Sequence, residues 1–137
     1  MSEESKAVLK RFFDDILNGG KLEVLDEIVS PDFFNHSTAM GVTPDREGWR
    51  TSLGMLLAGY SDLHYEVSDL MGEGEMAALR FDTTGIHVGN LFGVEPTGKK
   101  VDWSGMFICR VVDGKMVERW ELRTDLKTMQ QLGVIPS

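Results

Sequence analysis

Four ionisable side chains alternate near the end of this sequence, within the stretch RVVDGKMVERWELRTD. They are Arg119, Glu121, Arg123 and Asp125. In an extended strand, side chains two residues apart point to the same face of the sheet. A carboxylate enclosed with guanidinium groups can act as a general base or acid, whereas the same residues on a solvated face only form weak ion pairs. The chemistry of the chain therefore depends on which face of a sheet these residues occupy.

The register of the hairpin around Asp113-Gly114 bears on that question. A two-residue loop would set Met106 against Glu121. A three-residue loop over 113–115 would form a type I turn with a glycine bulge and shift the pairing by one residue. The shifted register is favoured because it gives one opposite-charge pair and two apolar pairs. These pairs are Arg110 with Glu118, Ile108 with Trp120, and Met106 with Leu122.

The shifted register divides the hairpin into two faces of different character. Its apolar face carries Met106, Ile108, Trp120 and Leu122, and its mixed face carries Trp103, Phe107, Cys109, Arg119, Glu121, Arg123 and Asp125. Aromatic groups among a few charges are typical of a ligand pocket. A solvated charged face remains the alternative.

Helices are expected first along the chain, and strands follow. Apolar residues at helical spacing predict a helix over 3–18 and a short one over 22–29, and Thr43-Pro44 indicates the cap and first turn of a third that ends near Gly59. From residue 62 onward the pattern alternates, which predicts strands from about 63, over 76–87, 100–112 and 116–124, and then a short closing helix. This order predicts an α+β fold with helices on an antiparallel sheet.

Length and composition exclude several classes of protein. The chain has 137 residues, which suits one domain spanning 1–137. Its net charge of −8 argues against nucleic-acid binding, and no apolar run is long enough to cross a membrane. The acidic, amphipathic start argues against a secretory signal. A single cysteine excludes an internal disulfide and a cysteine-based zinc cluster, so a cytoplasmic location is expected.

Three segments resemble the SnoaL-like polyketide cyclase, or ester cyclase, family. They are HVGNLFGVEPT at 87–97, RVVDGK at 110–115 and the closing QLG, and SPDFFNHS at 30–37 also fits, so the resemblance covers nearly the whole chain. It implies the cone-shaped fold of the nuclear transport factor 2 type, in which N-terminal helices pack on a strongly curved antiparallel sheet around a pocket. It also implies ring closure by aldol condensation with no cofactor and no metal.

The resemblance assigns roles to particular positions. The family's carboxylic general base falls on Glu121, where its members carry aspartate, and a pocket histidine falls on Phe107. An asparagine near the pocket mouth matches Asn35, and a loop histidine matches His87. With Phe107, Asn35 and His87, the expected substrate-binding residues include four more from the mixed face: Trp103, Arg119, Arg123 and Asp125.

Other interpretations of these residues stay open at this point. Glu121 could be a buried structural partner of an arginine, and Phe107 could mark a non-catalytic binding protein for a small hydrophobic ligand. Glu121, Arg123 and Asp125 also resemble the acid–arginine–acid set of related folds that hydrolyse small epoxides. Asn35 could cap a turn, and His87 could be bonded to the backbone.

The apolar face of the hairpin requires a cover. Because helices are expected on the opposite side of the sheet, Met106, Ile108, Trp120 and Leu122 would be exposed in a monomer. We therefore expect a homo-oligomer in which this face is buried, most simply a dimer with two-fold symmetry, with a tetramer as the alternative.

Overall fold

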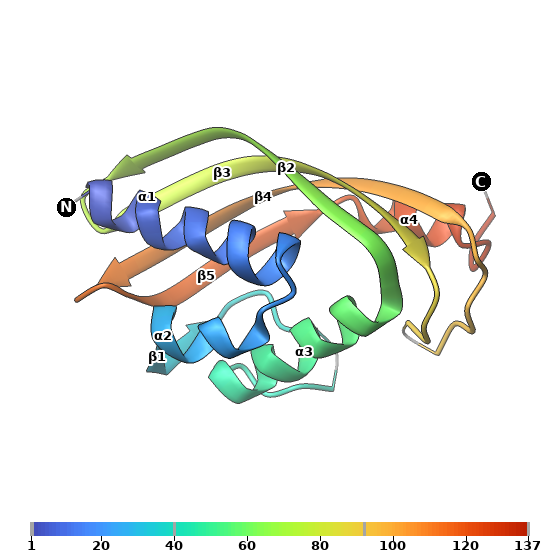
Figure 1. Ribbon diagram of the computed structural model, residues 1–137, viewed down its shortest axis with the longest axis horizontal. Coiled ribbons are helices and arrows are strands. Elements are labelled where there is room, and N and C mark those ends of the chain that lie inside the picture. Colours follow the sequence, from blue (N-terminus) through green and yellow to red (C-terminus); the bar gives the residue numbers. More distant parts are fainter. Residues whose placement is uncertain (1, 40, 92, 137) are drawn as a thin grey trace.

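A curved five-stranded sheet wraps around the helices in the computed structural model, which describes residues 2–39, 41–91 and 93–136 (Figure 1). The strand order is β1-β5-β4-β3-β2. The strands are β1 (Val29–Asn35), β2 (Tyr60–Glu73), β3 (Met76–His87), β4 (Lys100–Val112) and β5 (Lys115–Arg123). The helices are α1 (Ser2–Arg11), η1 (Phe12–Asn18), η2 (Leu22–Val24), α2 (Leu25–Ile28), α3 (Arg46–Gly59) and α4 (Asp125–Gln131). The α+β class is confirmed.

The first helix covers the predicted range but changes its winding on the way. α1 passes directly into η1, whose seven residues form a π-helix. The buried side of this composite helix carries Phe12, Phe13 and Ile16, which are almost fully enclosed. α1 lies across the concave side of the sheet in Figure 1, and its apolar stripe is therefore the inner layer of the core.

Strand β1 corrects the sequence prediction, which placed only a short helix over 22–29 and no strand after it. Residues from Val29 onward instead extend and pair with β5 in the parallel direction, so the sheet is mixed rather than wholly antiparallel. Pro31 is tolerated there because β1 is an edge strand and need not donate a ladder hydrogen bond at every position. The strand brings Asn35 level with Arg119.

The third helix starts two residues later than predicted. Asp45 is its N-cap, and the Asp45 carboxylate accepts a hydrogen bond of 2.8 Å from the amide of Gly48. Thr43 does not cap the helix; its hydroxyl donates to the Asp45 carboxylate at 2.6 Å. The helix ends at Gly59 and leads directly into β2.

The hairpin pairing is the one predicted, although the turn that produces it is different. Phe107 is level with Glu121, and Ile108 with Trp120. The loop itself has two residues, because Val112 pairs with Lys115 and both Asp113 and Gly114 have positive φ. Such a loop alone would give the unshifted register. The shift comes from a bulge in β5, where the pairing passes from Glu118 to Met116 and leaves Val117 without a partner residue on β4.

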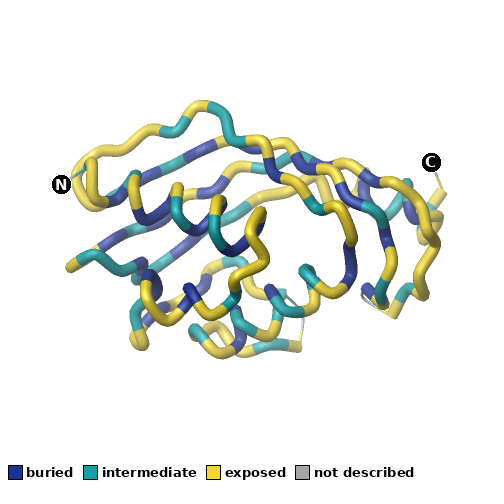
Figure 2. The backbone as a smooth tube through the Cα atoms, in the orientation of Figure 1, coloured by how far each residue is buried: buried dark blue, intermediate teal, exposed yellow. Residues whose placement is uncertain are grey.

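A glycine inside β4 allows the Phe81 ring to lie close against the strand. A Cβ atom at Gly105 would come within 2.5 Å of the Phe81 ring and 2.7 Å of the Leu122 carbonyl oxygen. Only glycine lets the Phe81 ring cross this strand. Figure 2 shows buried and exposed residues alternating along much of the strands.

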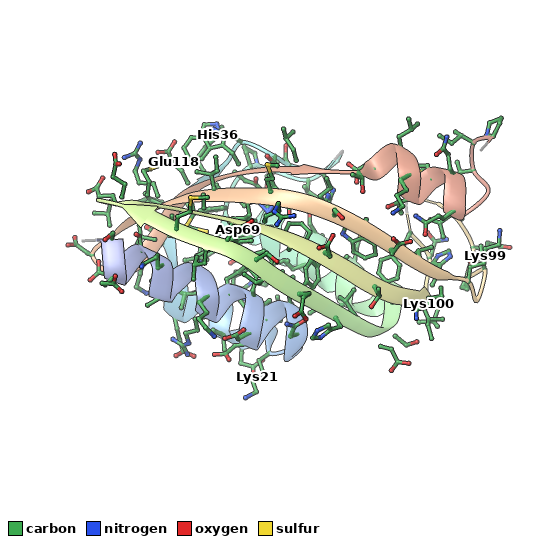
Figure 3. All side chains as sticks on the ribbon, turned by 90° about the horizontal axis from the view of Figure 1, so that it is seen from above. Lys21, His36, Asp69, Lys99, Lys100 and Glu118 are labelled. Carbon is green, nitrogen blue, oxygen red and sulfur yellow. The ribbon has the colours of Figure 1, made fainter. Side chains whose placement is uncertain are left out.

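The outer face of the sheet is exposed and partly apolar, as the faces of the hairpin predicted. Met106, Ile108 and Leu122 are all exposed there, and Trp120 stacks on His36 with 4.5 Å between the ring centroids. Figure 3 shows His36 and Glu118 close together on the side of the sheet away from α1. Within the described ranges, none of the helices has both the length and the apolar character needed to cross a membrane.

Candidate functional site

Two adjoining chambers lie between the concave face of the sheet and α3. The inner chamber has a volume of about 60 Å³ and the outer chamber about 280 Å³. Ala39, Ser52, Leu56 and Arg123 line both, so the chambers are neighbouring parts of one cavity. The walls are mainly apolar, with a few polar groups from the strands, which is the usual composition of a small-molecule site.

Glu121 is the one carboxylate among the described residues that line the inner chamber. Its side chain is only 10% exposed, and Arg119 Nη2 donates a hydrogen bond to its Oε1 at 2.9 Å. Arg123 Nη1 stands 4.0 Å from the same oxygen. Its other oxygen, Oε2, receives no hydrogen bond from the described part of the chain, so it can accept a proton or a hydrogen bond from a ligand.

The end of β1 holds Glu121 and its partner in place. The Asn35 side-chain oxygen accepts hydrogen bonds from Arg119 Nε at 3.1 Å and from the Ser37 amide at 2.9 Å. The Ser37 hydroxyl is bonded to the backbone of Glu121, at 2.7 Å to its nitrogen and 3.1 Å to its oxygen. Two donors on the Asn35 oxygen fix the orientation of the amide. The Asn35 amino group has no partner among the described residues, so it is left as a donor at the chamber that Asn35 lines.

Aromatic rings enclose the guanidinium of Arg119. Its central carbon lies 4.7 Å from the centre of the Trp49 ring and 5.1 Å from that of Phe107. Burial lowers the pKa of Arg119, and the Glu121 carboxylate opposes that change. Arginine stays charged over the accessible pH range. The inner chamber therefore contains a charge-compensated pair that is nearly closed off from solvent.

Arg123, Asp125 and Trp103 stand in the outer chamber. Arg123 is 33% exposed, and its Nε lies 3.4 Å from Asp125 Oδ1, while Asp125 itself is 69% exposed. Burial lowers the pKa of Arg123, but the carboxylates of Glu121 and Asp125 outweigh it and leave that pKa raised. An acid–arginine–acid set is thus present, but its second acid is mostly solvated and weakly held.

Two predicted site residues lie outside the described linings of both chambers. Phe107 is fully buried, and it contacts Arg119 as part of the aromatic wall rather than facing the cavity. His87 is also fully buried, and its Nδ1 accepts a 3.2 Å hydrogen bond from the Thr97 amide and lies 2.9 Å from the Thr97 hydroxyl. His87 thus holds the 88–98 loop to the end of β3. Strand alternation could not distinguish Phe107 or His87 from the residues that line the cavity, because both side chains point inward.

Sequence reasoning did not identify several residues that line the cavity. Tyr60 in the outer chamber, and Tyr65 and Ser37 in the inner one, were not among the candidates. For Tyr65 there was a signal. Tyr65 shares the inward face of a strand with Leu63 and Val67. A tyrosine hydroxyl placed in a core normally finds a polar partner or a cavity. In the described parts of the chain, no group of acidic, histidine and cysteine residues is arranged to bind a metal ion.

The chain matches a family model described as SnoaL-like polyketide cyclase over residues 7–132. It is 26% identical over 118 residues to nogalonic acid methyl ester cyclase from Streptomyces nogalater, a match that covers 85% of this chain and 88% of that protein. It is also 26% identical over 129 residues to aklanonic acid methyl ester cyclase from Streptomyces peucetius, with 91% and 88% covered.

Solved structures share the same fold. The structure of AclR from Streptomyces galilaeus, a proposed hydroxylase, superimposes with a TM-score of 0.85 at 29% identity, and the match covers 99% of this chain and 100% of that one. The fold is therefore common to proteins to which different reactions are ascribed, and the reaction must be argued from the site itself.

Proposed function

The chain belongs to the SnoaL-like polyketide cyclase family, and on that premise we propose that it closes a ring in a polyketide-type substrate, with Glu121 as the general base and no cofactor. The substrate carries a carbon flanked by carbonyl groups, as the aldol chemistry implied by the resemblance to this family requires. The observation that carries the proposal is the position of Glu121. It is the inner chamber's carboxylate, with one oxygen held by Arg119 and the other without a partner in the described residues.

The proposed reaction needs little more than a positioned base and a folded substrate. Glu121 takes the acidic proton, and the electron pair left behind becomes the carbon–carbon double bond of an enolate. The enolate carbon attacks a second carbonyl in the same molecule, and the new alkoxide takes the proton back. No proton or electron is gained or lost overall. The Asn35 amino group supports binding as a hydrogen-bond donor to a substrate carbonyl.

The two chambers suggest how a substrate would lie. The inner one has room for only a few water-sized groups, so it would take the reacting fragment. The outer one would hold the larger apolar part against Trp103 and Leu56. Arg123 lines both chambers and would contact the substrate where it narrows.

Glu121→Gln tests the proposal because it keeps the shape of the side chain and removes the base. With nogalonic or aklanonic acid methyl ester as the probe, turnover followed by chromatography should fall by about 10²–10⁴-fold. The dissociation constant should change little. Glu118→Gln is the matched control, since it makes the same change on the outer face of the same strand and should turn over normally.

Two other results of that experiment would point elsewhere. Turnover unaffected by Glu121→Gln would show that the general-base role is wrong. Binding of the esters without turnover by the unaltered protein would support a non-catalytic binding protein instead. Epoxide hydrolysis is the weaker alternative, since it would require Asp125 to be firmly placed and that carboxylate is mostly solvated.

We also propose that the protein forms a homodimer through the outer face of the sheet. Met106, Ile108 and Leu122 form an apolar surface on neighbouring strands, and Trp120 extends it toward β1. A surface of this kind is costly to leave in water. Sedimentation should give a mass near twice 15.3 kDa; a monomer at micromolar concentration would contradict the proposal.

A further inference from the structure

We propose that Tyr65 is a second catalytic residue of this site, whose hydroxyl donates a hydrogen bond to the substrate oxygen that becomes negative when Glu121 removes the proton. The inference rests on the proposed function above and adds a group that it does not contain. Glu121 can receive the proton and the Asn35 amino group can bind a substrate carbonyl, but the enolate oxygen gains from a further donor, because each donor aimed at developing negative charge in an enclosed chamber stabilises it.

Tyr65 lines the inner chamber from the edge of the sheet that lies opposite β1. It stands on β2, the edge strand opposite β1, whereas Glu121 stands on β5, yet both line the same small space. The chamber is too small for a whole substrate, so both residues must act on one fragment of it. That arrangement places a base and a donor on different walls around the reacting group.

The Tyr65 hydroxyl has no other task in the described structure. Tyr65 is only 4% exposed, and both of its hydrogen bonds to described residues involve its backbone. A buried phenol normally pairs its hydroxyl. Because Tyr65 lines the inner chamber, a hydroxyl that has no partner among the described residues is a donor available to a ligand there.

Both the backbone and the ring of Tyr65 are held in place by neighbouring residues, although Tyr65 stands on an edge strand. The Asn18 side chain donates to the Tyr65 carbonyl at 3.0 Å and accepts from its amide at 2.6 Å. These bonds occupy the outward backbone groups that an edge strand leaves unpaired. Phe13 packs edge-on against the ring, and Phe81 tilts against it, with centroid distances of 5.6 and 5.3 Å. The ring, and with it the hydroxyl oxygen, is therefore held in position before a substrate arrives.

The other donors near Glu121 are less suited to this task. Arg119 is committed to Asn35 and to Glu121 itself, and Arg123 stands at the boundary with the outer chamber and is partly solvated. Burial, together with the negative charge of Glu121, holds the pKa of Tyr65 well above its usual value. The phenol therefore stays protonated and acts by donating a hydrogen bond, not by giving up its proton.

Tyr65→Phe removes one oxygen atom and no hydrogen bond to the described residues, so the variant should melt at the same temperature as the unaltered protein. Its kcat with the methyl ester probes should fall about 10²-fold, with KM nearly unchanged, as expected for a donor used mainly in the transition state. Tyr60→Phe makes the same change in the outer chamber. Its effect on kcat should be at least about tenfold smaller.

A second measurement does not depend on turnover. The probe is 1-phenylbutane-1,3-dione, whose enolate and enol differ in absorbance, bound to protein that already carries Glu121→Gln. Adding Tyr65→Phe should shift the ionisation of the bound probe to higher pH by about one unit or more, since a hydrogen bond to a charged group is lost. An unchanged midpoint, or no binding of the probe, together with unchanged kcat, would overturn the inference.

The two proposals fail in different ways. If Glu121→Gln leaves turnover intact while Tyr65→Phe lowers it and shifts the probe, the base is misassigned and the donor stands. If Glu121→Gln abolishes turnover while Tyr65→Phe changes neither kcat nor the probe, the base stands and Tyr65 is structural.

Discussion

Strand β5 presents Arg119 and Glu121 to the interior of the protein and Trp120 and Leu122 to its exterior. The two inner side chains are 7% and 10% exposed, whereas Leu122 is 81% exposed. A strand that supported only a core would show the opposite pattern. Burying charged side chains and exposing a large apolar one are each costly in an isolated chain, and so each feature indicates a function. The inner charges suit chemistry on a small molecule, and the outer apolar groups suit a second protein surface.

The contrast between the two faces should be largest for the reactivity of thiols at two positions of β4, one on each face. Burial raises the pKa of Cys109 to about 12, which leaves roughly a thousandth of the thiolate of an ordinary cysteine at pH 8. Val112→Cys places a thiol at an exposed position on the outer face of the same strand, outside the proposed dimer surface. A disulfide reagent should modify the introduced thiol of this variant rapidly, and it should modify Cys109 only when the protein unfolds. Rapid native labelling of Cys109 in the unaltered chain would contradict the closed inner face.

Substitution of an arginine on each face should lower the free energy of unfolding by different amounts. Arg119→Met leaves Glu121 buried without its partner, which should lower the free energy of unfolding by about 3–5 kcal/mol. Arg110→Met breaks ion pairs with Glu118 and Glu75 on the outer face, and should cost less than about 1 kcal/mol. Denaturant unfolding at one protein concentration measures both. Equal losses would mean that the inner pair is not the more enclosed one.

Substitutions on the outer face should change the affinity between two chains rather than the stability of the fold. Leu122→Ser should weaken the proposed dimer at least about tenfold, because a leucine side chain buried on association contributes about 1.5–3 kcal/mol. Leu126→Ser, on α4, removes another exposed leucine outside that face and should leave the mass unchanged. Sedimentation at several concentrations distinguishes the two variants.

The smallest effect should be the pH dependence of the Glu118 ion pairs. Hydrogen bonds from His36 and Arg110 lower the pKa of Glu118 below its ordinary value of 4.5. A lowered carboxylate pKa stabilises the fold above pH 4.5, and that contribution is lost as the pH falls through the folded-state value. Glu118→Gln should therefore melt slightly lower at pH 7 and nearly equal to the unaltered protein at strongly acidic pH. A difference that grows on acidification would reverse the assigned sign.

The sequence allowed the faces of the hairpin to be predicted because pairing preferences act between residues close in the chain. Arg110 with Glu118 and Ile108 with Trp120 were sufficient to select the register. The way the extra residue is accommodated was not predictable, since a three-residue turn and a bulge at Val117 give the same pairs. Strand β1 was missed for a different reason. Its parallel partner lies more than eighty residues away in the chain, so no local pattern records the pairing.

Only part of the candidate site could be predicted for the same reason. Alternation placed Arg119, Glu121 and Arg123 on one face, but it could not distinguish a cavity wall from the layer behind it. Phe107 and His87 point inward as Glu121 does, and yet they lie beyond the described lining. That distinction depends on where α1, η1 and α3 leave space, which is set by packing across the fold.

The attachment of β1 to β5 also dictates when the site can exist. Asn35 and Ser37 contact Arg119 and Glu121 across 84 positions of the chain, and such long-range contacts form late in folding. A nascent chain still held at the ribosome when only α1 to α3 have emerged would lack β5 altogether. The base and its supports should therefore assemble only after β5 has been synthesised, so a chain released before that point would be inert.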